Sequence, residues 1–349
     1  MTNKIHNKNI ETETVITSPI ELRQHISVSE QGKENILSSR NTVEDIFLGN
    51  DDRLIVIVGP CSIHDSKAGI EYAKKLKKLS EKVKENIYIV MRVYFEKPRT
   101  TIGWKGLIND PDLNGTFNIP KGIKLGRQIL SEVTKIGLPT ATEFLDPFTP
   151  QYIGDFVSWG AIGARTTESQ THRQMASGLS MPIGFKNGTG GSVQLAIDAM
   201  IACEGEHAFL GIDNEGKTSV VTTKGNDANH VILRGGATGT NYDEESVKSA
   251  QKLLEKSGLE PNIVVDCSHG NSNKDHNRQP IVFNDVISQK VNGNSKIIGI
   301  MLESNINPGG QALEDDLSKL QYGVSITDKC VGWEKTEEII LEANETLGK

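Results

Sequence analysis

Short hydrophobic stretches rich in valine and isoleucine recur along the chain, and each is followed by a glycine, a proline or a polar residue. They predict strands at residues 54–59, 87–93, 139–144, 160–165, 182–186, 230–234, 262–266 and 297–303. Because the stretches are apolar throughout rather than alternating, they are typical of strands buried on both faces, as in a parallel sheet.

Segments with a helical spacing of apolar residues lie between most of these strands. They predict helices at residues 66–84, 122–136, 149–158, 192–203, 243–257 and 278–291. Eight alternating units predict an α/β fold, a (β/α)8 TIM barrel. The alternative is an open doubly wound sheet, which would place its ligands at one switch point, whereas polar residues end nearly every predicted strand here.

Three segments lie outside this alternation. Residues 1–50 precede the first strand and have helical signals after Pro19, so they predict an N-terminal arm attached to a barrel of residues 51–349. Residues 207–225 predict an inserted β-hairpin with its turn at residues 213–216. Residues 94–120 are too long for an ordinary connection and favour a binding loop.

Composition narrows the class of protein. The 349 residues include 38 Lys and Arg against 45 Asp and Glu, and a net charge of -7 argues against a nucleic-acid partner. No stretch approaches the roughly 20 apolar residues of a membrane span, and residues 1–10 do not resemble a secretory signal. The four cysteines are widely spaced, without a CxxC pair. We therefore expect a cytoplasmic protein without a membrane partner.

Four predicted strands end in a cation: Arg92, Arg165, Lys186 and Arg234. Active sites of TIM barrels lie at the carboxyl ends of the strands, so these side chains are expected to converge. A cluster of like charges is tolerated chiefly when an anion neutralises it. Arginine pairs well with phosphate and carboxylate, which favours a substrate carrying both groups. Separate salt bridges to neighbouring acids remain the alternative for any one of them.

A second set of residues has the chemistry of metal ligands: the strand-end residues Cys61, His269 and Glu303, together with Asp328 of Thr327-Asp328-Lys329. One thiolate, one imidazole and two carboxylates suit a divalent first-row metal. The four are distant along the chain and meet only if the barrel closes. Glycines elsewhere give no nucleotide signal, because residues 188–192 lack both the P-loop lysine and the dinucleotide spacing. Gly235 and Gly236 are expected to let the backbone approach a ligand.

Longer motifs give these residues a context. They are Gly59-Pro60-Cys61-Ser62, Lys97-Pro98-Arg99-Thr100, Gly163-Ala164-Arg165-Thr166, Gly184-Phe185-Lys186-Asn187-Gly188, Leu233-Arg234-Gly235-Gly236 and Asp266-Cys267-Ser268-His269-Gly270-Asn271-Ser272. Over about residues 15–335 the chain resembles the class I 3-deoxy-D-arabino-heptulosonate 7-phosphate (DAHP) synthases. The resemblance implies a transferase that condenses phosphoenolpyruvate, D-erythrose 4-phosphate and water to DAHP and phosphate, the first step of the shikimate pathway.

The resemblance also implies residue roles. The metal ligands would be Cys61, His269, Glu303 and Asp328, with Mn²⁺ expected and Fe²⁺, Co²⁺ or Zn²⁺ as alternatives. Phosphoenolpyruvate would be held by Arg92, Ala164, Arg165, Lys186 and Arg234, and erythrose 4-phosphate by Lys97, Arg99 and Thr100. Lys97, Lys186 and Glu143 are the expected catalytic residues, with Glu143 and Lys186 as alternatives for activating the water.

Regulation is implied in the same way. Members of this length form homodimers or homotetramers and are inhibited by an aromatic amino acid, bound where the arm meets the hairpin. The corresponding residues are Pro150, Gln151, Leu179, Ser180, Phe209, Gly211 and Val221. Phenylalanine-sensitive members carry serine where this chain has Gly211, which favours tyrosine as the effector. Two rival hypotheses are an aldolase that forms a Schiff base on Lys186 and a catalytically silent barrel that senses amino acids.

Overall fold

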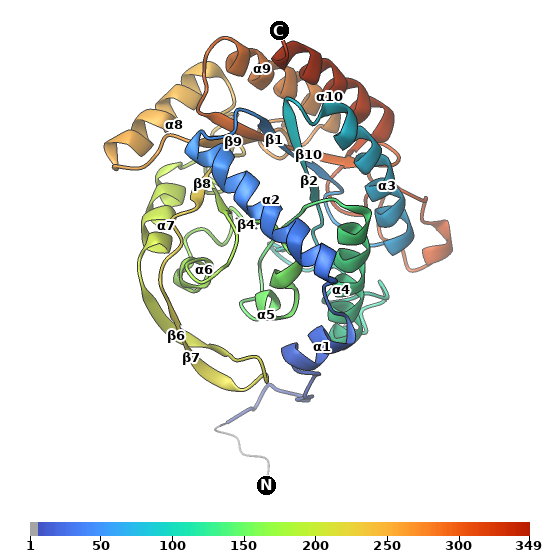
Figure 1. Cartoon of the computed structure of the whole chain (residues 1–349). Helices are drawn as coiled ribbons and strands as arrows, with labels where there is room; N and C mark the ends of the chain where they lie inside the picture. The colour runs from blue at the N-terminus through green and yellow to red at the C-terminus, as the bar shows by residue number, and fades with distance from the viewer. Residues whose placement is uncertain (1–5) are drawn as a thin grey trace.

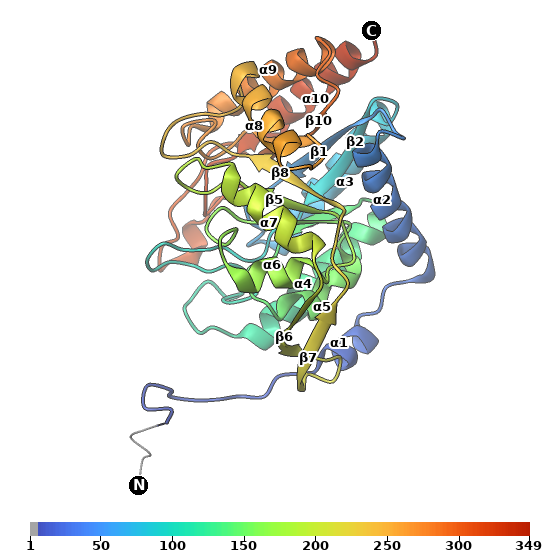
Figure 2. The same cartoon turned by 90° about the vertical axis from the view of Figure 1, so that its left-hand side faces the viewer.

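The computed structural model describes residues 6–349, in which parallel strands form a closed ring surrounded by helices (Figures 1 and 2). The strands pair in the order β1 (Leu54–Gly59), β2 (Ile87–Arg92), β3 (Thr140–Glu143), β4 (Trp159–Ile162), β5 (Ile183–Lys186), β8 (Asn229–Leu233), β9 (Ile263–Asp266) and β10 (Ile297–Asn305). Parallel pairing of β1 with β10 closes the ring. The predicted (β/α)8 TIM barrel is confirmed, and the open sheet is wrong.

The apolar strands are explained by burial on two sides. In β1, Leu54, Val56 and Val58 pack outward in the cluster shared with the helices, whereas Ile55 and Ile57 point into the barrel. All five are 0 or 1 % exposed. Side chains of a strand alternate between its faces, so a strand covered on both has no position left for a polar residue until it ends.

The predicted helices are present with shifted ends. They are α3 (Ser66–Val83), α4 (Ile119–Ile136), α5 (Thr149–Ile153) with a 3-10 turn at Gly154–Phe156, α7 (Gln194–Glu204), α8 (Glu244–Lys256) and α9 (Gln279–Val291). Two helices, α6 (Gln170–Ala176) and α10 (Trp333–Leu347), were not predicted from the sequence. In α6 only Met175 and Ala176 are buried, so its sequence has almost no apolar periodicity.

The N-terminal arm forms two helices, α1 (Pro19–His25) and α2 (Glu30–Leu48). Helix α2 crosses one end of the barrel (Figure 1), and its Val43, Ile46 and Phe47 join the apolar cluster inside the ring. This is the end at which the strands begin. The arm therefore covers the amino ends of the strands, and the carboxyl ends at the opposite side remain for a site.

A buried histidine marks the contact between the arm and the barrel. The ring of His230 lies 4.4 Å from that of Phe47, and the Trp159 indole Nε1 donates to its Nε2 at 3.3 Å. Burial lowers the pKa of His230 to about 3. The imidazole is therefore neutral at physiological pH and acts as a packing residue.

The predicted hairpin is confirmed as β6 (His207–Ile212) paired with β7 (Thr218–Thr223), a separate antiparallel sheet. The arm contacts its turn, because the Ile20 amide donates to Asn214 O at 2.9 Å. The arm also contacts α5, since the Tyr152 hydroxyl donates to Thr17 O at 3.1 Å. These contacts bring arm, hairpin and α5 to one side of the barrel.

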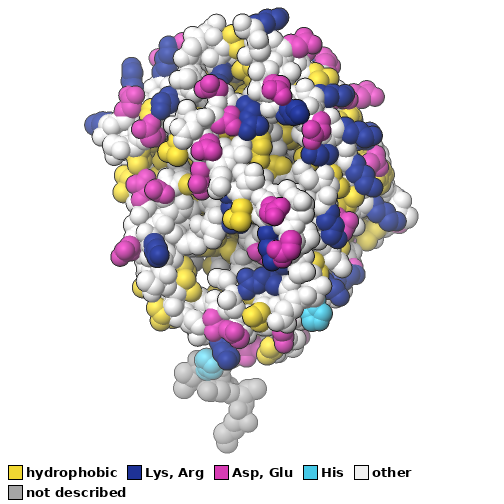
Figure 3. Space-filling view, viewed as in Figure 1, with side chains coloured by type: hydrophobic (Ala, Val, Ile, Leu, Met, Phe, Trp, Pro, Cys, Tyr) yellow, Lys and Arg dark blue, Asp and Glu magenta, His cyan; other side chains and the backbone are white. Residues whose placement is uncertain are grey.

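The surface over α2 carries lysine and arginine interspersed with aspartate and glutamate (Figure 3). Across residues 6–349, no helix combines the length and apolarity needed to cross a membrane.

Candidate active site

A cavity of about 360 Å³ opens at the carboxyl ends of the strands. Its wall includes most of the expected catalytic, substrate and metal residues: Lys97, Arg99, Glu143, Ala164, Arg165, Lys186, Arg234, His269, Glu303 and Asp328. Cys61 and Arg92 lie behind the wall, 0 % and 1 % exposed, and Thr100 lies on an exposed loop next to it. Barrel closure thus brings together residues that are far apart in the sequence.

Three of the four candidate metal ligands form a tight group. The ligand atoms of Cys61, Glu303 and Asp328 all lie within 4.8 Å of one another. Cys61 is the second residue after β1, and Glu303 pairs with Gly59 of that strand in the β1–β10 register. Asp328 lies in the segment that follows β10. Its neighbour Cys330 holds this segment near Cys61, because the Cys330 Sγ accepts a hydrogen bond from the Cys61 amide at 3.4 Å.

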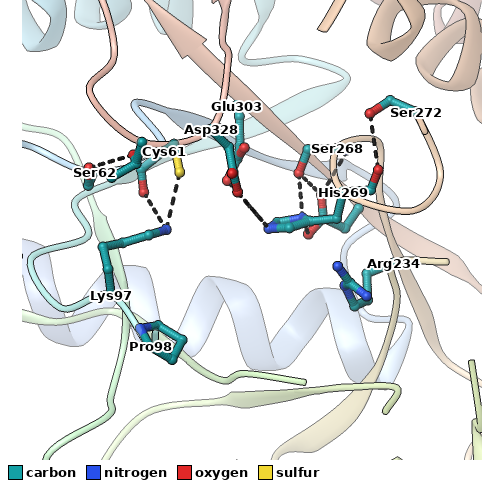
Figure 4. Close-up of polar contacts among 12 residues, drawn as sticks. Cys61, Ser62, Lys97, Pro98, Arg234, Ser268, His269, Ser272, Glu303 and Asp328 are labelled. Carbon is teal, nitrogen blue, oxygen red and sulfur yellow. Dashed lines mark hydrogen bonds and ion pairs between the residues drawn. The ribbon is translucent and has the colours of Figure 1, made fainter. Parts of the chain in front are cut away.

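The fourth candidate, His269, lies beside this group, with its imidazole directed toward Asp328 (Figure 4). Its Nε2 is 3.7 Å from Glu303 Oε1 and 3.8 Å from Asp328 Oδ2, while its Nδ1 is 3.0 Å from Asp266 Oδ2. A carboxylate behind a ligand histidine fixes the tautomer that leaves Nε2 free to bind a metal. The His269 φ of 55° is in the left-handed region, rare for residues other than glycine and frequent at functional sites.

The charges of the group depend on its burial. Burial raises the pKa of the Cys61 thiol and Glu303 adds to this, while Lys97 opposes it. Although burial alone would raise the pKa of Asp328, Lys97 and His269 hold it below its usual value. Sulfur, imidazole and carboxylate donors in one group fit a first-row divalent cation, which would displace the thiol proton on binding.

Two cationic side chains donate hydrogen bonds to the ligand group. Arg92 Nη2 donates to Glu303 Oε1 at 2.9 Å and to Cys61 O at 3.2 Å, and its Nε donates to Pro60 O at 3.0 Å. Lys97 Nζ donates to Cys61 O at 3.2 Å and to Cys61 Sγ at 3.1 Å. Arg92 is expected to hold a substrate: its Nε and Nη2 are engaged by Pro60 O, Cys61 O and Glu303, while its Nη1 has no partner among the described residues.

The cavity is also lined by Arg165, Lys186 and Arg234, which stand at the carboxyl ends of β4, β5 and β8, across the ring from β1, and which we call the cationic wall. Lys186 Nζ lies 3.1 Å from Asp266 Oδ2, and both side chains are almost fully buried. Although burial would raise the pKa of Asp266, Lys186 and His269 hold it well below its usual range. Burial lowers the pKa of Arg234. Arg165 is exposed, and among residues 6–349 its guanidinium donates one hydrogen bond, to Pro98 O at 3.4 Å, so it is available to a ligand.

Glycines in the motifs permit close packing around the cavity. A Cβ on Gly163 would lie 2.3 Å from Glu143 Oε1, so only glycine leaves room for that carboxylate. Gly235 has a φ of +69°, and a Cβ there would lie 2.6 Å from the amide nitrogen of Asn271. Gly235 thus lets the loop after β8 pack against the loop that carries His269, whereas the sequence analysis expected it to admit a ligand.

The long loop after β2 is folded back on itself. The Lys97 amide donates to Lys105 O at 2.8 Å, and Arg99 Nε donates to Trp104 O at 2.7 Å. The Trp104 indole donates to Asp110 O at 2.8 Å. These contacts fix the segment that presents Lys97 and Arg99 to the cavity.

Several residues of the site were missed. Gln279 clamps the backbone of Glu303, donating to its carbonyl at 3.2 Å and accepting from its amide at 2.9 Å. Lys274 and Lys329 add cations to the cavity wall. Asp266 was recognised as a strand-end residue of the Asp266–Ser272 motif, but its contacts with Lys186 and His269 were not predicted. Gln279 begins a helix and gave no signal.

The candidate effector residues lie near the arm. On the hairpin, a Cβ on Gly211 would lie 2.8 Å from Val221 Cγ2 and 3.9 Å from Phe209 Cε2. The turn after α6, which carries Leu179 and Ser180, is joined to the hairpin by the 2.6 Å contact between Ser177 Oγ and Thr223 Oγ1. Pro150 and Gln151 begin α5, the helix that the arm contacts.

Comparison with known proteins gives consistent matches. The sequence model of the DAHP synthetase I family matches residues 24–341. The Tyr-sensitive phospho-2-dehydro-3-deoxyheptonate aldolase of Escherichia coli K12 is 51% identical over 343 residues, 98% of this chain and 96% of that protein. The phenylalanine-inhibited enzyme of Saccharomyces cerevisiae is 51% identical over 331 residues, 93% of this chain and 89% of that protein. The structure of phospho-2-dehydro-3-deoxyheptonate aldolase from Francisella tularensis superimposes with a TM-score of 0.95 and 49% identity, covering 97% of this chain and 99% of that one.

Proposed function

The chain belongs to the DAHP synthetase I family, and on that basis we propose that it condenses phosphoenolpyruvate with D-erythrose 4-phosphate and water to give DAHP and phosphate. One observation carries this proposal: a single cavity has the Cys61–Glu303–Asp328 ligand group on one side and the cationic wall on the other. Such a cavity suits a reaction between an anionic phosphoester and an aldehyde.

The cationic wall holds phosphoenolpyruvate in this proposal. Arg165 and Arg234 pair with its phosphate and carboxylate, and the Ala164 amide and Lys186 contribute further donors. Neutralising both anions relieves the repulsion among the cations and fixes the methylene carbon next to the aldehyde. Lys97, Arg99 and Thr100 lie on the loop after β2 and receive the phosphate of the aldose.

The ligand group would hold a divalent metal through Cys61, His269, Glu303 and Asp328. Such a cation, when bound, supplies Lewis-acid polarisation of the aldehyde oxygen. A carbon–carbon bond then forms between the phosphoenolpyruvate methylene and the aldehyde carbon. Water adds to the former enol carbon, and the phosphate leaves from that carbon. Manganese as the physiological metal stays a prediction.

Glu143 is the residue we favour for accepting the proton of that water. It lies in the cavity wall and forms no salt bridge with any residue of the described chain, 6–349. Lys186 was the alternative, but its ammonium is engaged by Asp266 at 3.1 Å. The same contact disfavours the Schiff-base hypothesis, because a lysine nucleophile has to be an uncharged amine.

Phosphate release from the two substrates tests the activity. We expect the purified protein to release phosphate only when both substrates are present, to lose this activity on treatment with a chelator, and to regain it with Mn²⁺. Borohydride treatment in the presence of substrate is the control for the rival mechanism. Substrate trapped covalently on Lys186, with activity resistant to the chelator, would contradict the proposal.

We also propose that an aromatic amino acid binds where α5, the turn after α6 and the hairpin meet the arm. The relatives include a Tyr-sensitive and a phenylalanine-inhibited enzyme. Phenylalanine-sensitive members of the family carry serine where this chain has Gly211, next to Val221 and Phe209, and this favours tyrosine as the effector. Assembly as a homodimer or homotetramer and a cytoplasmic location stay predictions.

The effector is tested by repeating the phosphate assay with each aromatic amino acid. Tyrosine is expected to inhibit at lower concentration than phenylalanine, and Gly211→Ser is expected to shift the preference toward phenylalanine. Binding of tyrosine without any phosphate release in its absence would instead support the silent sensor. Inhibition by phenylalanine alone would contradict the tyrosine assignment.

A further inference from the structure

The aromatic ring of Tyr94 faces Arg92 and Lys97, the two cationic side chains that contact Cys61. Tyr94 is the second residue after β2, and it is 0 % exposed. The Arg92 Cζ lies 3.5 Å from the centroid of its ring, and the Lys97 Nζ lies 5.9 Å from the same centroid. Both distances are within the ~6 Å over which the negative face of an aromatic ring attracts a cation.

We propose that Tyr94 is a positioning residue whose ring holds Arg92 and Lys97 against Cys61 and so preorganises the ligand group of the metal site. The two cations make complementary contacts. Arg92 joins Cys61 O to the Glu303 carboxylate, whereas Lys97 reaches both the carbonyl and the sulfur of Cys61. The proposal rests on the proposed function only in taking this group as the metal site.

The stacking geometry explains why a fully buried guanidinium is held in one orientation. Arg92 is 1 % exposed, and its Nε and Nη2 have backbone or carboxylate acceptors while its Nη1 has none among the described residues. Hydrogen bonds along one edge of the guanidinium leave it free to tilt about that edge. A ring against its flat face removes this freedom, and movement of Arg92 would move the Cys61 and Glu303 groups to which it is bonded.

The ring and the hydroxyl of Tyr94 have separable roles. The hydroxyl is buried and has no hydrogen-bond partner within the part of the chain that the structure describes. Burial raises the pKa of Tyr94 far above its ordinary value, Arg92 opposes this, and Glu143 and Asp266 add to it. The side chain is therefore neutral. Since the hydroxyl makes no contact that removal would break, the interaction with the cations comes from the ring.

Tyr94 also packs with Ile57, Val90 and Met301 inside the barrel, so a packing role has to be separated from the positioning role. Three variants achieve this. Tyr94→Phe keeps the ring, and Tyr94→Leu removes it. Phe283→Leu makes a comparable truncation at a fully buried aromatic of α9, whose ring packs in the cluster between strands and helices and not in the cluster inside the barrel. If Tyr94→Leu does not fold, Tyr94→Met replaces it, because the flexible methionine side chain fills irregular space better.

The measurement is a titration of each purified protein with Co²⁺, without substrates, in competition with a chelator. The charge-transfer absorption of a cobalt–thiolate bond reports contact with Cys61. Tyr94→Leu is expected to weaken Co²⁺ binding about 10- to 100-fold, the usual effect of disturbing groups behind metal ligands. Tyr94→Phe is expected to bind Co²⁺ nearly as tightly as the natural chain. Phe283→Leu is expected to lower the melting temperature and leave Co²⁺ affinity unchanged.

Two results would overturn the proposal: Co²⁺ affinity retained in the variant without the ring, or an equal loss in Phe283→Leu. Its failure is distinguishable from failure of the proposed function. A natural chain that binds Co²⁺ through the thiolate but releases no phosphate from the two substrates contradicts the proposed function alone. A natural chain with no cobalt–thiolate absorption contradicts the metal site and the role of Tyr94 together.

Discussion

Replacement of Cys61 with alanine is expected to abolish divalent-metal binding at the ligand group and to lower turnover by about a thousandfold or more. The thiol is the only sulfur in the group of Cys61, Glu303 and Asp328 that the described residues form. Without it, two carboxylates and His269 remain, so a divalent cation loses one of its four candidate ligands. Lewis-acid catalysis contributes several kcal/mol to such reactions, and each ~1.4 kcal/mol is a tenfold change in rate.

The same substitution leaves Lys97 without a partner for one of its hydrogen bonds. We therefore expect a second, smaller effect on the orientation of Lys97 that added metal does not restore. The measurements are metal content after dialysis against Mn²⁺ and the rate of phosphate release. Cys203→Ala is the matched control, because Cys203 is equally buried but lies in α7. Full activity of Cys61→Ala would show that the metal site is wrongly assigned.

Much of the barrel could be predicted because a buried strand requires an uninterrupted apolar stretch in the sequence. A strand such as β1 with both faces covered has to be apolar until it ends, and the first polar side chain then stands at the rim. This is why Arg165, Lys186 and Arg234 could be placed on one cavity from the sequence. In contrast, α6 makes few apolar contacts, so nothing in its sequence separates it from a loop.

The contacts around Cys61 could not be predicted for a different reason. Strand position places Arg92 at the rim, but whether its guanidinium turns to the cavity or back toward Pro60 depends on rotamers and on neighbours from other strands. Tyr94 follows the apolar stretch of β2, and from the sequence alone it is indistinguishable from an ordinary core residue. Only three-dimensional proximity shows that its ring lies under Arg92 and Lys97.

Arg165→Ala is expected to weaken phosphoenolpyruvate binding about 10- to 100-fold while leaving the protein folded. Loss of a charge-assisted contact to an anion costs ~1.5–3 kcal/mol, and each ~1.4 kcal/mol is a tenfold change in affinity. Arg165 is exposed and has one long contact, to Pro98 O at 3.4 Å, so its loss is expected to change the free energy of unfolding by less than about 0.5 kcal/mol. Titration calorimetry with phosphoenolpyruvate and thermal unfolding measure the two effects.

The matched control for this prediction is Arg278→Ala. Arg278 is also exposed and precedes α9, but it is not part of the cavity wall. If only the loss of one positive charge matters, both variants bind any anion equally weakly, and the difference from the natural chain disappears at high salt because the charges are screened. A lost bidentate contact affects Arg165→Ala alone and persists at high ionic strength. If the natural chain and Arg165→Ala bind phosphoenolpyruvate with equal affinity, Arg165 does not contact this substrate. If Arg165→Ala and Arg278→Ala lose affinity equally, Arg165 contributes only through its positive charge.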